Sequence, residues 1–175
     1  MVGLVLAAGL TVGLFSGVGT GPSSGGRPAI GDAAPSFTLP RLGGGGTVGT
    51  PSSGGGNGRP AVLLFFASWC GPCQTEIPAL AAAVKAQHDS GSPLSRVPVL
   101  GVDTADPRGL AFVRASGVTF PVGSDATYDV TQGVYGFPGD PYAVAVDRNG
   151  RIVAIKGGPL SVAGLERWQR RLVAR

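Results

Sequence analysis

Two cysteines, Cys70 and Cys73, are the residues of this chain best suited to chemistry. They are the only cysteines among 175 residues, and two residues separate them. An apolar run, residues 61–66, precedes them and an amphipathic helical pattern follows. Two thiols at a strand-to-helix junction can form and break one disulfide bond, so the spacing predicts thiol–disulfide exchange.

The two thiols differ in their expected position on the helix. Cys73 lies four residues before Ile77 and therefore on the apolar stripe of the helix, whereas Cys70 lies at the helix start. Unpaired N–H groups and the positive end of the helix dipole favour a thiolate there. Lowering a thiol pKa from about 8.5 to about 7 requires about 2 kcal/mol, and a helix terminus supplies about 0.3–2 kcal/mol. We therefore expect Cys70 to attack and Cys73 to resolve the mixed disulfide.

Other uses of this cysteine pair fit the residues less well. A structural disulfide that closes so short a loop removes little chain entropy. A zinc site requires four ligands, and the remaining soft candidate, His88, has no partner in the sequence. A c-type haem site requires histidine at the position of Gln74. The sequence therefore predicts no metal and no cofactor beyond the redox-active disulfide.

Glu76 and Pro141 each allow two interpretations. Glu76 follows Cys73 by three residues and flanks the buried stripe, so it is either a buried acid or base with a raised pKa or an ordinary acid in the first helical turn. Pro141 follows the turn-rich stretch 135–139, so it is either a cis-proline of a tight turn or a plain loop proline. The residues alone leave both alternatives open.

The surrounding pattern predicts an α/β fold. Helices and strands alternate and a hairpin then closes the sequence, which indicates a central mixed β-sheet covered by helices on both faces, with a long helical insert at 103–141. The predicted strands are 37–39, 61–67, 97–102, 142–146 and 151–155, and the predicted helices are 70–88, 107–116, 125–133 and a last one capped by Ser161.

The N-terminal region differs in composition from the rest. Residues 1–20 are apolar and carry no charged side chain, which fits a transmembrane anchor or a signal segment. The positively charged start of a signal peptide is missing, which leaves open a start further upstream. We expect export across a membrane, with a retained anchor favoured over cleavage and over a disordered Gly-rich tail. The expected organisation is then a flexible spacer, 21–30, and one domain, 31–175, interrupted by a mobile Gly-rich surface loop, 43–58.

Charge and composition exclude one function class. The chain is 43% hydrophobic, which suffices for a core, and its formal net charge is +4. The basic residues are scattered and form no stripe, so we expect a solvated surface and no nucleic-acid partner.

In their order along the chain, these motifs resemble the thioredoxin superfamily and, within it, the TlpA/ResA-type (DsbE-like) extracytoplasmic thiol–disulfide oxidoreductases. The resemblance extends from Gly31 to the C-terminus. Four motifs carry it: the opening segment 31–39, the active-site strand and loop 64–73, the Cys-X-X-Cys-X-X-Glu-X-Pro pattern that ends at Pro78, and the turn 135–141.

The resemblance implies a thioredoxin-like fold and a role for each matching residue. Cys70 attacks, Cys73 resolves, and Glu76 is the buried acid that assists proton transfer. Pro141 is the cis-proline that faces the disulfide. The implied partner-binding residues are Trp69, Gly71, Pro72, Asp140 and Pro141. Thioredoxins proper carry a buried aspartate where this chain has Leu64, which favours the TlpA/ResA group.

The resemblance also implies a biological setting. Its members reduce disulfides in exported proteins, including apocytochrome c before haem attachment, and a membrane thiol donor re-reduces them. They lie at the extracytoplasmic face of the cell envelope, anchored through the N-terminal segment or secreted. Two alternatives remain, a disulfide-forming oxidase and a non-catalytic thioredoxin-like binding module. Peroxidase activity is disfavoured because Ala67 stands where peroxiredoxins require Thr or Ser, and copper delivery because the cysteines are too close and a distant histidine is missing.

Overall fold

The structure, a computed structural model, describes residues 27–50 and 58–174. The predictions for residues 1–20, for most of the spacer and for positions 51–57 of the Gly-rich loop lie outside these ranges. Along the described chain the elements are β1 (Thr38–Pro40), β2 (Thr47–Gly49), β3 (Ala61–Phe66), α1 (Gly71–Asp89), η1 (Pro93–Arg96), β4 (Val99–Thr104), α2 (Gly109–Ala115), β5 (Val122–Asp125), the π-helix η2 (Asp129–Val134), β6 (Tyr142–Val146), β7 (Ile152–Gly157) and α3 (Val162–Val173).

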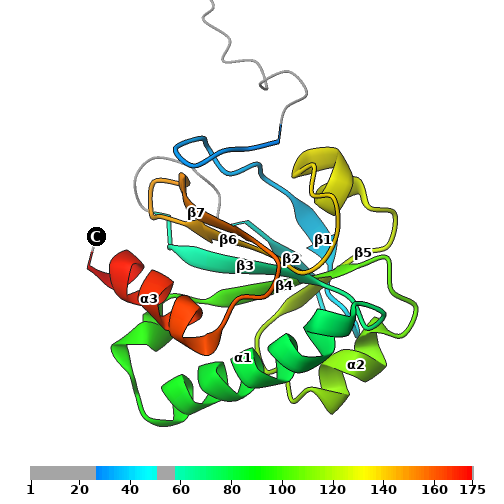
Figure 1. Cartoon of the computed structure of the whole chain (residues 1–175), viewed down its shortest axis with the longest axis horizontal. Coiled ribbons are helices and arrows are strands. Elements are labelled where there is room, and N and C mark those ends of the chain that lie inside the picture. The colour runs from blue at the N-terminus through cyan, green and yellow to red at the C-terminus, as the bar shows by residue number, and fades with distance from the viewer. Residues whose placement is uncertain (1–26, 51–57, 175) are drawn as a thin grey trace, which may run out of the picture.

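A five-stranded mixed sheet forms the centre of the molecule (Figure 1). Its strand order is β5-β4-β3-β6-β7, with β3, β4 and β5 parallel and with β6 and β7 antiparallel to their neighbours. All six residues of β3 are buried. A strand covered on both faces reads as a continuous apolar run, which is why β3 could be predicted from the sequence.

The α-helices pack on one face of this sheet (Figure 1). Alternate residues of β3, among them Leu64 and Phe66, share a cluster with Ile77 and Leu80 of α1 and with Leu165 of α3. Helix α1 continues through its internal Pro78 to Asp89. This packing holds α1 against the strand that leads into it.

The second face carries a different cover. Here Phe65 of β3 lies 5.1 Å from the ring of Tyr135 and 4.9 Å from that of Phe137, and Phe37 lies in the same cluster. The sequence predicted helices on both faces, and the helix on this face is the short η2. Much of the remaining cover comes from the N-terminal residues of the domain.

Residues 31–42, which we call the N-terminal strap, run from one sheet edge to the other. At one end, the Gly31 N–H donates to the Ile152 carbonyl at 2.8 Å and the Ile152 N–H donates to the Asp32 carbonyl at 2.9 Å. At the other end, the Leu42 N–H donates to the Val122 carbonyl at 2.8 Å. The strap therefore hydrogen-bonds to both outer strands, β7 and β5.

Residues 27–30, the described end of the predicted spacer, contact the domain. Pro28 is buried, and the Arg27 Nε donates to the Gly136 carbonyl at 3.1 Å.

Two strands were missed in the sequence. The connection 103–141, for which the sequence predicted the two helices 107–116 and 125–133, also contains β5. The Gly-rich loop contains β2, which pairs with β1. Both strands are too short to show the alternation of apolar and polar residues that predicts a strand. Gly123 of β5 allows close packing because it has no side chain. A Cβ at this position would lie 2.9 Å from the Cβ of Leu39, which is too close. The missing side chain lets Leu39 and the buried Val48 pack over β5.

Within the described ranges, no helix combines the length and apolar character that a membrane span requires.

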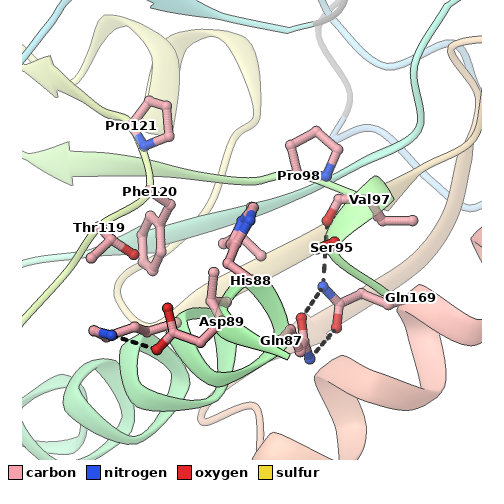
Figure 2. Close-up of a pocket in the computed structure, with 13 residues that line it drawn as sticks. Gln87, His88, Asp89, Ser95, Val97, Pro98, Thr119, Phe120, Pro121 and Gln169 are labelled. Atoms are coloured by element: carbon pink, nitrogen blue, oxygen red, sulfur yellow. Dashed lines mark hydrogen bonds and ion pairs between the residues drawn. The ribbon is translucent and has the colours of Figure 1, made fainter. Parts of the chain in front are cut away.

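A pair of buried amides joins α1 to α3 (Figure 2). The Gln87 Nε2 donates to the Gln169 Oε1 at 2.9 Å, and the Gln169 Nε2 donates back to the Gln87 Oε1 at 3.0 Å. The Gln169 Nε2 also lies 3.3 Å from the Val97 carbonyl. The pair satisfies two polar side chains that the helix packing would otherwise bury without partners.

We expect Gln169→Leu to lower the free energy of unfolding by about 1–3 kcal/mol, because it leaves the Gln87 amide buried without its partner. Urea unfolding of Gln169→Leu, Gln87→Leu and the double variant measures the coupling between the two amides. The double variant should lose less than the sum of the single losses. Exposed Gln132→Leu is the control and should change stability by less than about 0.5 kcal/mol. Strict additivity would contradict a functional amide pair.

Candidate active site

The sheet topology brings three chain segments to one end of the sheet, where β3 and β4 finish. We call this end the active-site edge, and it is distinct from the outer strands β5 and β7. Parallel strands β3 and β4 both end there, and antiparallel β6 begins there, with Phe66 in register with Asp103 and Phe65 in register with Tyr142. Residues 67–73, 104–108 and 139–141 therefore meet beyond this edge, where ligands of open α/β sheets commonly bind.

The disulfide Cys70–Cys73 lies at this edge, with an S–S distance of 2.06 Å. Cys70 is the N-cap residue of α1, and its Sγ accepts a hydrogen bond from the Cys73 N–H at 3.2 Å. Cys73 is fully buried, and Cys70 is 4% exposed. The positions agree with the sequence analysis, since the sulfur of Cys70 lies at the helix end whose N–H groups stabilise negative charge.

The predicted partner-binding residues divide by exposure. Trp69 is 48% exposed, and Gly71 and Pro72 are also exposed, so all three are accessible beside the disulfide. Asp140 is half-buried and Pro141 is buried, and the peptide bond between them is cis. Of the two interpretations of Pro141, the structure supports the cis-proline.

Two side chains that the sequence analysis did not single out hold the backbone before Cys70. The Ser68 N–H donates to the carboxylate of Asp106, and the Gln74 Nε2 donates to the Ser68 carbonyl at 2.9 Å. Burial acts to raise the pKa of Asp106, but hydrogen bonds from Ser68 and Arg108 and the positive charge of Arg108 outweigh it, so the pKa lies below its usual range. Asp106 is thus a charged acceptor for the active-site loop.

Glu76 is a buried acid. It is 8% exposed and lies one turn after Cys73. Burial raises its pKa to about 7, against the opposing effects of the Leu160 hydrogen bond and the Lys156 charge. The Leu160 N–H donates to Oε1 at 2.9 Å, and Oε2 is buried without a hydrogen-bond partner among the described residues. The interpretation of Glu76 as an ordinary acid in the first helical turn is therefore excluded.

Two aspartates near this edge have raised pKa values as well. Burial raises the pKa of the fully buried Asp103 to about 7, and the charges of Asp106 and Asp140 add to the effect. Burial likewise raises the pKa of Asp140 to about 6. Asp103 escaped the sequence analysis, although its position directly after the apolar strand run 97–102 placed it at this edge.

A groove of about 450 Å³ lies at the opposite end of α1 from the disulfide (Figure 2). It is lined by the last turns of α1, by residues 95–99 and 119–121, and by Gln169. Across the part of the chain that the structure covers, no group of three or more His, Cys, Asp or Glu side chains is arranged to hold a metal ion. The disulfide and the three acids with raised pKa values, in contrast, lie at or near the other end of α1.

Comparison with known proteins gives one matching family model, the AhpC/TSA family, over residues 30–155. Among curated proteins, the chain is 28% identical over 137 residues to the thiol-disulfide oxidoreductase ResA of Oceanobacillus iheyensis, covering 78% of this chain and 69% of that protein. It is 35% identical over 107 residues to the thiol:disulfide interchange protein DsbE homolog of Paracoccus denitrificans, covering 58% of this chain and 54% of that protein.

Among solved structures, a secreted thiol-disulfide isomerase from Corynebacterium glutamicum superimposes with a TM-score of 0.66. The match covers 88% of this chain and 96% of that chain at 20% sequence identity. This likeness confirms the thioredoxin-like fold that the sequence motifs implied.

We expect Glu76→Gln to change how stability depends on pH. In the wild type the folded chain holds a proton on Glu76 between pH 4.5 and about 7, where the unfolded chain has lost it, so stability falls as pH rises through this window. The loss from Glu76 alone should be about 2–3 kcal/mol. The amide introduced by the substitution keeps an acceptor for the Leu160 N–H and cannot ionise.

Urea unfolding from pH 4 to pH 8 measures the difference between the two proteins. The difference isolates Glu76 from Asp103 and Asp140, which titrate in an overlapping range in both. Parallel pH profiles for the wild type and the variant would show that Glu76 is not the titrating group.

Proposed function

Because the chain belongs to the AhpC/TSA family of thioredoxin-like proteins, and is a thiol–disulfide oxidoreductase of the ResA/DsbE type, we propose that its Cys70–Cys73 pair reduces disulfides in exported proteins. The observation that carries this proposal is the asymmetry of the pair. The sulfur of Cys70 accepts an N–H at the start of α1, while Cys73 is fully buried on the same helix.

The proposed reaction begins with both cysteines reduced. The thiolate of Cys70 attacks one sulfur of a partner disulfide, a mixed disulfide forms, and the other partner sulfur leaves as a thiolate. Cys73 then attacks the sulfur of Cys70, which restores the Cys70–Cys73 bond and releases the second partner sulfur. The partner gains two electrons and the enzyme pair loses two, so a thiol donor must reduce the pair again.

Glu76 is proposed to accept the proton of the Cys73 thiol and to return it. A buried thiol is a poor nucleophile until it loses its proton. A carboxyl group with a pKa of about 7, one helical turn away, is matched in acidity to a proton transfer near neutral pH. In its ionised form Glu76 accepts the proton of Cys73, and in its protonated form it returns a proton when the disulfide is reduced.

The exposed residues beside the disulfide are proposed to bind the partner chain. Trp69 provides a large apolar surface, and Gly71 and Pro72 leave the approach to Cys70 free of bulky side chains. Asp140 and Pro141 are proposed to complete this surface, because the register of β6 with β3 brings them to the same edge. A partner segment would then lie between Trp69 and the turn that carries Pro141.

The reductive direction and the setting are part of the proposal. Gly71-Pro72 between the cysteines resembles reducing thioredoxins, which favours reduction, with apocytochrome c as one candidate partner and a membrane thiol protein as donor. The apolar residues 2–20 and the secreted relative favour an extracytoplasmic location, anchored or secreted. The alternative is an oxidase that forms disulfides in exported proteins.

We expect Cys73→Ser to accumulate a mixed disulfide at Cys70 when the purified chain meets a peptide disulfide, because no thiol remains to resolve the adduct. Cys70→Ser should form at least about tenfold less adduct, since Cys73 is buried. Mass spectrometry of the intact protein measures both. Equal and slow adduct formation by the two variants would favour a non-catalytic binding module.

The equilibrium reduction potential of the Cys70–Cys73 couple tests the direction. We expect a value near that of thioredoxin, about −270 mV, measured against a glutathione or dithiothreitol series. A value near about −120 mV, as in strong disulfide oxidants, would reverse the assignment to disulfide formation.

A further inference from the structure

Four buried or half-buried side chains with oxygen atoms form a series of contacts, called the oxygen chain below, that links the partner-binding turn to the sheet. Thr104 ends β4, Asp125 ends β5, Thr131 lies in η2, and Asp140 directly precedes Pro141. Thr104, Asp125 and Thr131 are each at most 2% exposed. Four separate segments thus meet through side-chain oxygens at the active-site edge.

The contacts along this chain run in one line. The Thr131 Oγ1 donates to Asp125 Oδ2 at 2.6 Å, the two threonine Oγ1 atoms lie 3.2 Å apart, and the Thr104 Oγ1 lies 3.4 Å from Asp140 Oδ1. These are three oxygen–oxygen contacts, but each threonine hydroxyl supplies one hydrogen, so there are two hydroxyl hydrogens. All three contacts can be hydrogen bonds only if one carboxyl group carries the third hydrogen.

The third hydrogen belongs on Asp140. Asp125 accepts the backbone N–H groups of Val130 at 3.2 Å and Thr131 at 2.7 Å, so its negative charge is solvated by donors. Among the described residues, Asp140 accepts no backbone N–H, the Thr104 hydroxyl is its one contact with a donor group, and its Oδ2 is buried without a hydrogen-bond partner. The negative charge of Asp125 from β5 also disfavours a charge on Asp140, and the buried Asp103 from β4 opposes it as well once Asp103 itself is ionised.

We propose that Asp140 is a positioning residue whose carboxyl group, carrying a proton, completes the chain Asp140–Thr104–Thr131–Asp125 and thereby fixes the turn before Pro141 for partner binding. In this state Asp140 donates to Thr104, Thr104 donates to Thr131, and Thr131 donates to Asp125. This inference rests on the proposed function of the turn.

Loss of the proton to solvent changes the chain in two ways. The Thr104 hydroxyl turns to the Asp140 carboxylate, and its contact with Thr131 then has no hydrogen. The new charge on Asp140 also repels the carboxylate of Asp125, and that of Asp103 once the pH exceeds about 7. Since burial holds the pKa of Asp140 at about 6, the turn is fixed below this pH and released above it.

The test compares two reductants of the Cys70–Cys73 disulfide in the full chain from pH 5 to pH 8. One is dithiothreitol, which needs no partner-binding turn. The other is a ten-residue peptide with a single cysteine, two molecules of which reduce the pair and leave as one peptide disulfide. The ratio of the two rates cancels effects on the sulfur chemistry itself. We expect the wild-type ratio to fall about tenfold as pH rises through about 6, the effect of losing one hydrogen bond.

Two variants and a control give the result its meaning. In Asp140→Asn the amide donates to Thr104 at every pH, so the ratio should stay high and flat. In Thr104→Val the chain is broken at every pH, so the ratio should be low and flat. Asp129→Asn removes an exposed charge from η2 but changes none of the four side chains of the oxygen chain, so its ratio should follow that of the wild type. A wild-type ratio that does not change with pH, or an Asp140→Asn profile like the wild type, would overturn the inference.

A second measurement separates this inference from the proposed function. Exchange of the Thr104 and Thr131 hydroxyl protons with solvent, followed by NMR, should be slow below about pH 6 and faster above it in the wild type, but slow throughout in Asp140→Asn. Absence of that change overturns the proton chain. If the change is seen but the wild-type protein shows no preference for the peptide at any pH, the proposed partner-binding role of the turn is what fails.

Discussion

The burial of one face of α1 against the sheet is the constraint on which the active site depends. Ile77 and Leu80 fix the rotation of the helix, and this rotation places Cys73 in the interior and Cys70 at the first turn. At about 100° per residue, the positions directly before and after Cys73 point away from the sheet and are exposed, so a spacing longer or shorter by one residue would lose the inner sulfur. The different reactivities proposed for the two thiols are thus a consequence of helix packing.

Burial also decides the chemistry of the acids around the disulfide. Glu76, Asp103 and Asp140 come from three different elements, and burial is the largest cause of the raised pKa in each. Asp106 is the counterexample, because donors and a nearby arginine hold its pKa low. A reaction that moves two electrons and their protons through a covered site is served by groups that exchange protons near neutral pH. The edge of the sheet therefore holds one carboxyl group with a lowered pKa and three with pKa values of about 6 to 7.

Elements that carry a local sequence motif could be predicted, whereas elements that depend on pairing with distant residues were missed. The buried strand β3, the start of α1 and the Ser161 cap of α3 follow from apolar period and capping chemistry, and the structure confirms each. The strand β5 has four residues and no period, and its place in the sheet comes from its neighbours.

The same distinction holds for the site. Cys70, Cys73 and Glu76 were visible as a spaced motif. Asp106 and Thr104 act through residues 38 and 36 positions away in the sequence, Ser68 and Asp140 respectively, and no local pattern encodes such a contact.

The N-terminal strap has a consequence for the order in which the chain can fold. Its residues leave the ribosome, or a translocation channel that passes the N-terminus first, more than a hundred positions before Ile152, the residue to which Gly31 and Asp32 bind. Contacts of such sequence separation form late, because the loop that joins them must close first. Until then the outer edges of β5 and β7 expose unpaired backbone groups that another chain can join. The contact of the strap with β7 therefore cannot form until Ile152 has been synthesised, and we expect the open sheet edges to be a site of aggregation during this interval.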